Sequence, residues 1–368
     1  MKKLPFPLLI PLAMLLLAAG FYIHNYVTFV HTPPELTVKE ERMVDTLFAS
    51  TKAQCVGRYM FEVPASFENT RADRAQINEV SISSKRLYPP AFAQRIRLRE
   101  EELLNGHTVR KMDQPFLKQI FRLSDRSVIF DRNENESVPG FGRILEGHLY
   151  VDGVAFTLTQ EITDLSDPKY QKDKADFINA GVSIDFLNNK AQKLAELQDL
   201  MSRLSGRKDD EIPTQPGTCI SEGFIRDGRE KPKEDITFVY PHNPVFSLSV
   251  STNTSLGDPK SMLERSHEIQ PYLTEVKVRT LRKGKTQLAG FEADEWLNNA
   301  PSERSSDPLA KQLLFNIIAN EKIVDFRHPI IDLTLSNHNL PPPTYSDAEL
   351  LEVWDRITRS FRLRDNAF

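Results

Sequence analysis

The fold is decided by two short segments, Cys55-Val-Gly-Arg-Tyr-Met-Phe-Glu-Val-Pro64 and Thr218-Cys-Ile-Ser-Glu-Gly-Phe-Ile-Arg226. Both are strand-like, and each contains one of the chain's two cysteines, which stand 164 positions apart. An alternating strand at 79–83 and a helix at 90–104 follow the first segment, and an alternating strand at 246–251 and a helix at 258–269 follow the second. The offsets agree to within a few residues, so the sequence predicts an internal duplication.

Each half then continues into a hairpin. Asp152-Gly153 separates two strands at 143–151 and 154–160, and this dipeptide is typical of a type I′ turn, which needs positive φ. In the second half, Val276 and Val278 alternate with polar residues, which predicts a strand with one buried face. Lys283-Gly284 is expected to make the turn before a returning strand at 286–296.

A helix is expected to close each half. Apolar residues at three- and four-residue steps predict one helix over 184–204, ending at Gly206. The last helix is expected to begin after Ser346, an N-cap residue with Glu349 at the capping-box position. Between the halves, 206–217 is charged, then rich in Pro and Gly, and lacks apolar periodicity, which predicts a linker.

The predicted fold class is therefore α+β, with two similar domains, each an antiparallel sheet covered by helices. The predicted boundaries are a signal peptide or membrane anchor at 1–32, an N-terminal domain at 33–206, a linker at 207–217 and a C-terminal domain at 218–368. A length of 368 residues, more than a single core usually organises, agrees with two domains.

The amino terminus predicts export. Lys2 and Lys3 precede a 20-residue apolar run from Leu4 to Ile23, and there is no Asp, Glu, Lys or Arg from Leu4 to Pro34. Small residues at Ala18–Gly20 fit a cleaved signal peptide, whereas the length of the run fits an uncleaved anchor. In both cases the remaining chain is expected in the periplasm, in the second case anchored to the inner membrane by residues 4–30.

Charge and cysteine content exclude several classes of protein. The chain has 47 Lys+Arg and 51 Asp+Glu, a formal net charge of −4, so it offers no polybasic surface for nucleic acid. In an oxidising periplasm Cys55 and Cys219 are a candidate disulfide, and two separate buried thiols are the alternative. Two cysteines cannot supply a Cys-based zinc or iron–sulfur site.

The usual catalytic motifs are missing from the sequence. It contains no Gly-x-Ser-x-Gly, the nearest match being 181–185, and no His-Glu-x-x-His, P-loop or Gly-x-Gly-x-x-Gly. Glu264, His267 and Glu268 could begin a metal site but lack a second His nearby, so a solvated helix face is the favoured interpretation. His148 lies within an expected strand and is interpreted as a sheet-face residue rather than a base. No enzymatic activity, metal or cofactor is expected.

The chain resembles the type VI secretion lipase immunity protein family. The resemblance is carried by Cys55-Val-Gly-Arg-Tyr59, Val63-Pro64, Cys219-Ile-Ser-Glu-Gly-Phe-Ile225 and the signal-like start, and it extends over 45–365 in arrangement. It implies a two-domain periplasmic protein that grips a phospholipase effector like a claw, one to one, so that the lid of the effector cannot open towards lipid. No motif identifies effector-contact residues, so none is assigned.

Two other functions are weighed against this one. An envelope-anchored scaffold or assembly chaperone would bind several partners and give no protection against a toxin. An envelope hydrolase would use scattered acids or His148 and would lose activity on His148→Ala. The export signal, the similar halves and the missing catalytic motifs favour the immunity protein.

Overall fold

The computed structural model describes residues 35–69, 73–242, 245–302, 311–337 and 345–368. The expected signal or anchor segment at 1–32 lies outside these ranges, so whether it is cleaved stays a prediction. No helix among the described residues is both long enough and apolar enough to cross a bilayer.

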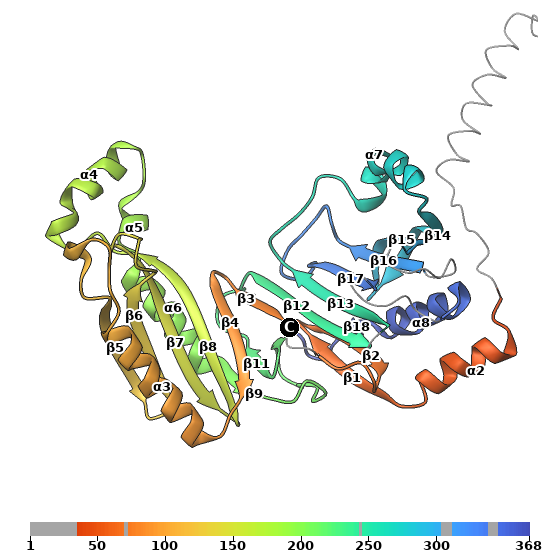
Figure 1. Ribbon diagram of the computed structural model, residues 1–368, viewed down its shortest axis with the longest axis horizontal. Helices are drawn as coiled ribbons and strands as arrows, with labels where there is room; N and C mark the ends of the chain where they lie inside the picture. Colours follow the sequence, from red (N-terminus) through yellow and green to blue (C-terminus); the bar gives the residue numbers. More distant parts are fainter. Residues whose placement is uncertain (1–34, 70–72, 243–244, 303–310, 338–344) are drawn as a thin grey trace, which may run out of the picture.

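Most described strands form one antiparallel sheet of twelve strands that runs through both lobes of the molecule (Figure 1). The first half of the chain supplies β3 (Arg74–Ile77), β4 (Val80–Arg86), β5 (Leu117–Ser124), β6 (Ser127–Asn133), β7 (Gly142–Val151) and β8 (Val154–Thr163). The second half supplies β12 (Glu234–His242), β13 (Phe246–Asn253), β14 (Arg279–Leu288), β15 (Phe291–Pro301), β16 (Lys311–Ala319) and β17 (Ile330–Ser336).

The order of these strands is palindromic. It runs β14-β15-β16-β17-β13-β12-β3-β4-β8-β7-β6-β5, so the order in one lobe mirrors the order in the other. The lobes join where β3 pairs antiparallel with β12, from Glu234 opposite Ile77 to Thr237 opposite Arg74. The sheet therefore has a pseudo-twofold arrangement, which is what an internal duplication produces when the two copies pair edge to edge.

The short hairpins that contain the cysteines are exchanged between the halves. β1 (Thr51–Val56) and β2 (Tyr59–Pro64) pair with β18 (Arg362–Leu363) at the end of the chain. Conversely, β10 (Gly217–Ile220) and β11 (Gly223–Arg226) pair with β9 (Leu204–Gly206), at the end of the first half. Each lobe is thus completed by a hairpin from the other half of the sequence.

Aromatic packing fixes the first exchange. Tyr59 stacks on Phe361 with ring centroids 5.5 Å apart, and Phe61 contacts Tyr240 edge-on at 5.7 Å. These side chains join one core of buried residues that runs through both lobes. In the second exchange, Gly223 lies so close to Phe156 that a Cβ at this position would stand 2.7 Å from the ring.

A disulfide joins the two exchanged hairpins. Cys55 and Cys219 are fully buried and bonded to each other, with their Cα atoms 5.8 Å apart. The predicted linker packs against them, because buried Arg207 donates to the carbonyl oxygens of Gly223 at 3.0 Å and Cys55 at 3.1 Å. Arg207 and Gly217, at the two ends of the predicted linker, are therefore packed into the centre, whereas the residues between them are exposed or partly exposed.

Helices cover both faces of the sheet near its two ends. Three of them begin with complete capping boxes, at Thr37, Ser261 and Ser346, so the prediction at Ser346 and Glu349 is confirmed. The described helices are α2 (Val38–Leu47), α3 (Pro89–Leu104), α4 (Gln171–Asn179), α5 (Ile184–Leu187), α6 (Lys190–Arg203), α7 (Met262–Glu275) and α8 (Asp347–Ser360), with 3₁₀ turns η2 (Lys111–Asp113) and η3 (Pro168–Tyr170).

Three local predictions were wrong. The strand expected at Val276 begins only at Arg279, because α7 continues to Glu275 and Lys277 has a φ of 58°. The expected turn at Lys283-Gly284 lies inside β14, and the chain turns at Ala289-Gly290, where φ is positive at both residues. The helix expected over 184–204 is divided into α5 and α6.

Candidate functional site

One face of the long sheet is the main candidate for a binding site. Directly opposite residues in antiparallel strands share a face, so the register traces that face across the molecule. One row runs from Glu146 on β7 through Thr159, Ser81 and Gln76 to Asp235 on β12. The next row runs from β3 to β15 through Arg74, Thr237, Ser251, Asp332, Ile318 and Asp294.

A helix stands at each end of this face. Arg99 of α3 donates to both carboxylate oxygens of Glu146, at 2.8 and 2.7 Å. At the other end, the backbone N–H of Leu263 in α7 donates to the carboxylate of Asp294 at 2.8 Å. Because α3 and α7 follow equivalent strands in the two halves, the pseudo-twofold arrangement places them as two walls.

Between these walls the face consists mostly of short, uncharged polar side chains, which we call the floor. In β13, Leu248 and Val250 are fully buried on the core side, whereas Ser247, Ser249 and Ser251 on the opposite side are partly exposed. The other floor residues, also outside the core, are Gln76, Ser81, Ser83, Thr157, Thr159, Thr237, Asn316, Thr334 and Ser336.

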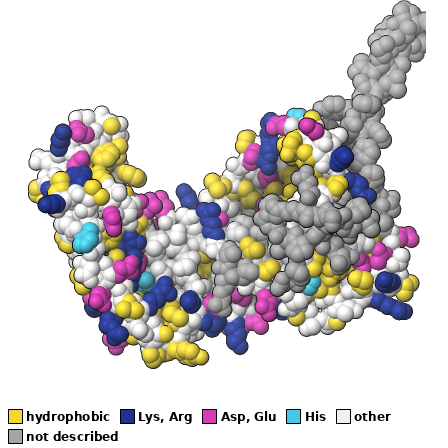
Figure 2. Space-filling model, viewed as in Figure 1, with side chains coloured by type: hydrophobic (Ala, Val, Ile, Leu, Met, Phe, Trp, Pro, Cys, Tyr) yellow, Lys and Arg dark blue, Asp and Glu magenta, His cyan; other side chains and the backbone are white. Residues whose placement is uncertain are grey.

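The floor lies in the hollow of the molecule. Figure 1 shows two lobes joined by β3, β4 and β12, and Figure 2 shows an outline hollowed between them, with a largely white surface where the lobes meet. Beside the floor, on the same sheet face, Arg74 pairs with Asp235 at 3.0 Å. Ser and Thr adapt their hydrogen bonds easily and lose little rotamer freedom on contact, so this surface suits a protein partner more than catalysis.

The predicted sheet-face residue His148 lies in a groove of about 650 Å³ between α3 and the floor. It is buried, and its ring contacts the carboxylate of Glu146 at 2.9 Å and the hydroxyl of Thr157 at 3.4 Å. Arg132 also donates to Glu146, at 2.5 Å. Burial alone would raise the pKa of Glu146, but hydrogen bonds from Arg99 and His148 and the charge of Arg132 outweigh it and lower that pKa well below its usual range.

Carboxylate, imidazole and hydroxyl thus stand in the order of a catalytic triad, but the geometry favours a structural role. The 3.4 Å contact from His148 to Thr157 is longer than the roughly 2.6–3.2 Å over which a base activates a nucleophile. Arg95 donates to the same hydroxyl at 3.3 Å. Two arginines already hold Glu146, so its charge ties α3 to the sheet instead of orienting a base.

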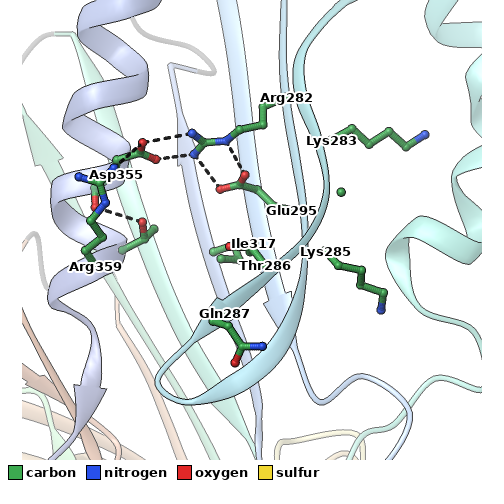
Figure 3. Close-up of a pocket in the computed structure, with 11 residues that line it drawn as sticks. Arg282, Lys283, Lys285, Thr286, Gln287, Glu295, Ile317, Asp355 and Arg359 are labelled. Atoms are coloured by element: carbon green, nitrogen blue, oxygen red, sulfur yellow. Dashed lines mark hydrogen bonds and ion pairs between the residues drawn. The ribbon is translucent and has the colours of Figure 1, made fainter. Parts of the chain in front are cut away.

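A smaller cavity of about 290 Å³ lies between β14 and α8 (Figure 3). At its centre Arg282 bridges Glu295, at 2.6 Å, and Asp355, and Trp354 donates to Glu295 at 2.8 Å. Burial alone would lower the pKa of Arg282, but hydrogen bonds to Asp355 and Glu295 outweigh it and raise the pKa. Because these charges are paired, the network fastens β14, an edge strand of the sheet, to α8.

The candidate metal residues on α7 have other partners. Glu264 pairs with Lys322 at 2.7 Å, Glu268 pairs with Lys260 at 2.8 Å, and His267 contacts the backbone oxygen of Glu264. Within the described ranges no group of three or more His, Cys, Asp or Glu side chains is placed to hold a metal ion. The side chains of Glu264 and Glu268 are partly exposed and paired with lysines on the solvent side of α7.

Comparison with known proteins assigns the family. The family model of the Tle cognate immunity protein 4 N-terminal domain matches residues 52–207, and that of the C-terminal domain matches 211–366. The chain belongs to the Tle cognate immunity protein 4 family. The resemblance inferred from the two cysteine-containing segments is thereby confirmed.

Two solved structures share this fold at low sequence identity. The apo structure of immunity protein TplEi of the type VI secretion system from Pseudomonas aeruginosa is 20% identical, with a TM-score of 0.68 over 86% of this chain and 97% of that chain. A chain of the Tle4–Tli4 complex is also 20% identical, with a TM-score of 0.68 over 86% and 98% of the two chains. No match was found among curated protein sequences.

Membership of the Tle cognate immunity protein 4 family agrees with a binding protein rather than an enzyme, as the sequence predicted. The α+β fold class is also confirmed. Sequence reasoning missed the floor, although the alternation of Ser with apolar residues at 246–251 was its signal. That pattern shows that one face of one strand is exposed to solvent. It does not show that the solvent-exposed faces of seven adjacent strands, from β16 to β8 in the sheet, align into one surface.

Proposed function

We propose that this chain is a periplasmic immunity protein that binds a type VI secreted phospholipase effector and occludes it, using the floor and its two helical walls. The observation that carries the proposal is the polar sheet face that continues across both lobes between α3 and α7. Its support from comparison is the fold shared with a chain of the Tle4–Tli4 complex.

The shape and chemistry of the surface fit occlusion. An inhibitor of a secreted enzyme needs at least a standard interface of about 1,600 Å² in total, which a concave surface between two lobes can supply. Short hydroxyl side chains on a rigid sheet need little reordering when a partner docks, so more of the contact free energy remains for affinity. We propose one immunity protein for each effector.

We further propose that 33–206 and 218–368 are the two duplicated units, with 1–32 as the export segment and 207–217 as the connection. The palindromic strand order supports the duplication, and the uncharged run from Leu4 to Pro34 supports export. Protection of a cell against a lipase that acts on periplasmic phospholipid requires the inhibitor on the same side of the inner membrane.

The test is protection and complex formation. The test uses the phospholipase encoded by the gene next to that of this protein, which we call the neighbouring phospholipase. Residues 33–368, exported with a cleavable signal, should restore growth to cells that express this phospholipase in the periplasm. They should also co-purify with it in a one-to-one complex. Cytoplasmic residues 33–368 should give no protection. No complex and no rescue would refute the proposal, and several unrelated partners without rescue would favour an envelope scaffold or chaperone.

A further inference from the structure

The first half contains a segment without a counterpart in the second half. Residues 164–189, which connect β8 to α6, include η3, α4 and α5. The equivalent connection from β17 to α8 has only ten residues, 337–346. This difference breaks the pseudo-twofold arrangement at the outer end of the N-terminal lobe, where α4 lies in Figure 1.

Large apolar side chains are concentrated on this extra segment. We call Phe177, Ile178, Ile184 and Phe186 the apolar tip; 37%, 42%, 58% and 62% of these residues, respectively, are exposed to solvent. Single exposed apolar residues are ordinary, but four within ten positions are a local concentration of the kind found at interaction surfaces. Figure 2 shows hydrophobic surface on this lobe, including its flank towards the hollow.

The tip is built on an ordered support. Buried Leu165, Tyr170 and Leu187 form a small core beneath it, and the hydroxyl of Tyr170 donates to buried Asp113 at 2.7 Å. Gly181, with a φ of +86°, turns the chain between α4 and α5, and a Cβ added there would meet nothing within 4 Å. A preformed apolar surface binds without a large ordering cost.

Two observations indicate a protein rather than a membrane as the occupant. Residues 171–187 contain Lys172 and Lys174 but also three aspartates, so the segment lacks the basic face that draws an amphipathic helix to anionic lipid. Across the hollow, α7 also exposes apolar residues, Ile269 and Tyr272, so both lobes offer apolar contacts at the rim of the proposed interface.

We infer that the apolar tip is an anchor for the phospholipase effector and contacts an apolar surface that the enzyme otherwise presents to lipid. The inference rests on the proposed function. An enzyme that acts on phospholipid must carry an apolar contact surface, and a partner that covers this surface competes directly with lipid. Apolar anchors at an interface rim exclude water from the polar floor, which strengthens the hydrogen bonds made there.

The test compares Phe186→Asp with Val38→Asp. Phe186 and Val38 are similarly exposed, at 62% and 65%, but Val38 lies on α2 at the opposite end of the molecule (Figure 1). Binding to the neighbouring phospholipase, with its nucleophile replaced by Ala, is measured by calorimetry. We expect Phe186→Asp to weaken binding at least tenfold, Val38→Asp to stay within twofold of the unsubstituted protein, and Phe186→Leu to retain most affinity.

A second variant, Ile184→Ser with Phe186→Ser, adds no charge and should also bind at least tenfold more weakly, with an unchanged melting temperature. Unchanged affinity of both tip variants, or equal loss in Val38→Asp, would overturn the inference while the proposed function stands. Absence of binding by the unsubstituted protein would overturn both. Tip-dependent sedimentation with phosphatidylethanolamine–phosphatidylglycerol vesicles, without loss of effector affinity, would assign the tip to the membrane instead.

Discussion

Cys55 and Cys219 are 164 residues apart in the sequence, yet their Cα atoms lie 5.8 Å apart in a disulfide between the two exchanged hairpins. Hydrogen bonds between the backbones of Gly57 and Cys219, at 3.0 and 2.7 Å, run beside this bond. The covalent link therefore fastens the point at which each half of the chain enters the lobe of the other half. It also connects export to stability, because the bond needs an oxidising compartment.

Removal of the disulfide should destabilise the protein. In the chain-entropy model a closed loop of this length contributes about 5 kcal/mol, and typical measured bridges contribute about 2–4 kcal/mol. We expect Cys55→Ala with Cys219→Ala to lower the free energy of unfolding by an amount in that range, measured in guanidinium chloride. Reductant should destabilise the unsubstituted protein and leave the double variant unchanged; equal stability of the two proteins without reductant would contradict the prediction.

Loss of Arg58 should be more costly than loss of a surface cation. Arg58 is buried and pairs with Asp227 at 2.6 Å and with buried Glu234 at 2.7 Å, which joins the first hairpin to the second half. Arg58→Ala leaves Glu234 without its partner, for which we expect a loss of about 3–5 kcal/mol in unfolding free energy. The control is Lys260→Ala, which removes an exposed ion pair with Glu268 and should leave the unfolding free energy nearly unchanged, because solvent screens such pairs.

Stability should fall in acid partly through Glu146. Its pKa is lowered in the folded state by Arg99, His148 and Arg132, so its ionised form stabilises the fold. That contribution is fully present above the ordinary value of 4.5 and is lost as pH falls below it. We expect Glu146→Gln to be less stable at pH 7 by about 3 kcal/mol or more and to lose less stability between pH 7 and pH 3. Parallel pH profiles of the two proteins, measured by chemical unfolding, would exclude this role.

A bulky cation on the floor should block the effector without unfolding the protein. Ser249 lies between Val239 and Thr334 on neighbouring strands of the floor and is partly exposed. We expect Ser249→Arg to reduce effector affinity about a hundredfold and to abolish growth rescue, with an unchanged melting temperature. Ser202→Arg, on α6 at the other sheet face, is the matched control and should bind and rescue normally. Normal rescue by Ser249→Arg would move the interface away from the floor.

Local patterns in the sequence predicted many of the elements. The Asp152-Gly153 turn, with φ of 50° and 77°, and the capping box at Ser346 were predictable because one or two residues determine their geometry. The wrong prediction of a turn at Gly284 also rested on a single residue. Glycine often marks a turn, but Gly284 has a φ of 159°, which is extended backbone within β14. In such cases the pairing of long strands outweighed a local turn preference.

Two similar α+β halves are predictable from the sequence, because alternation, helical periodicity and the order of elements repeat along it. The pairing of β3 with β12 and the exchange of the hairpins, in contrast, became visible only in the folded chain. Strand alternation shows which face of a strand is buried but not which distant strand pairs with it or which lobe a hairpin completes. Those choices depend on packing between residues such as Tyr59 and Phe361, more than 300 positions apart, and they align the wet faces of separate strands into one floor.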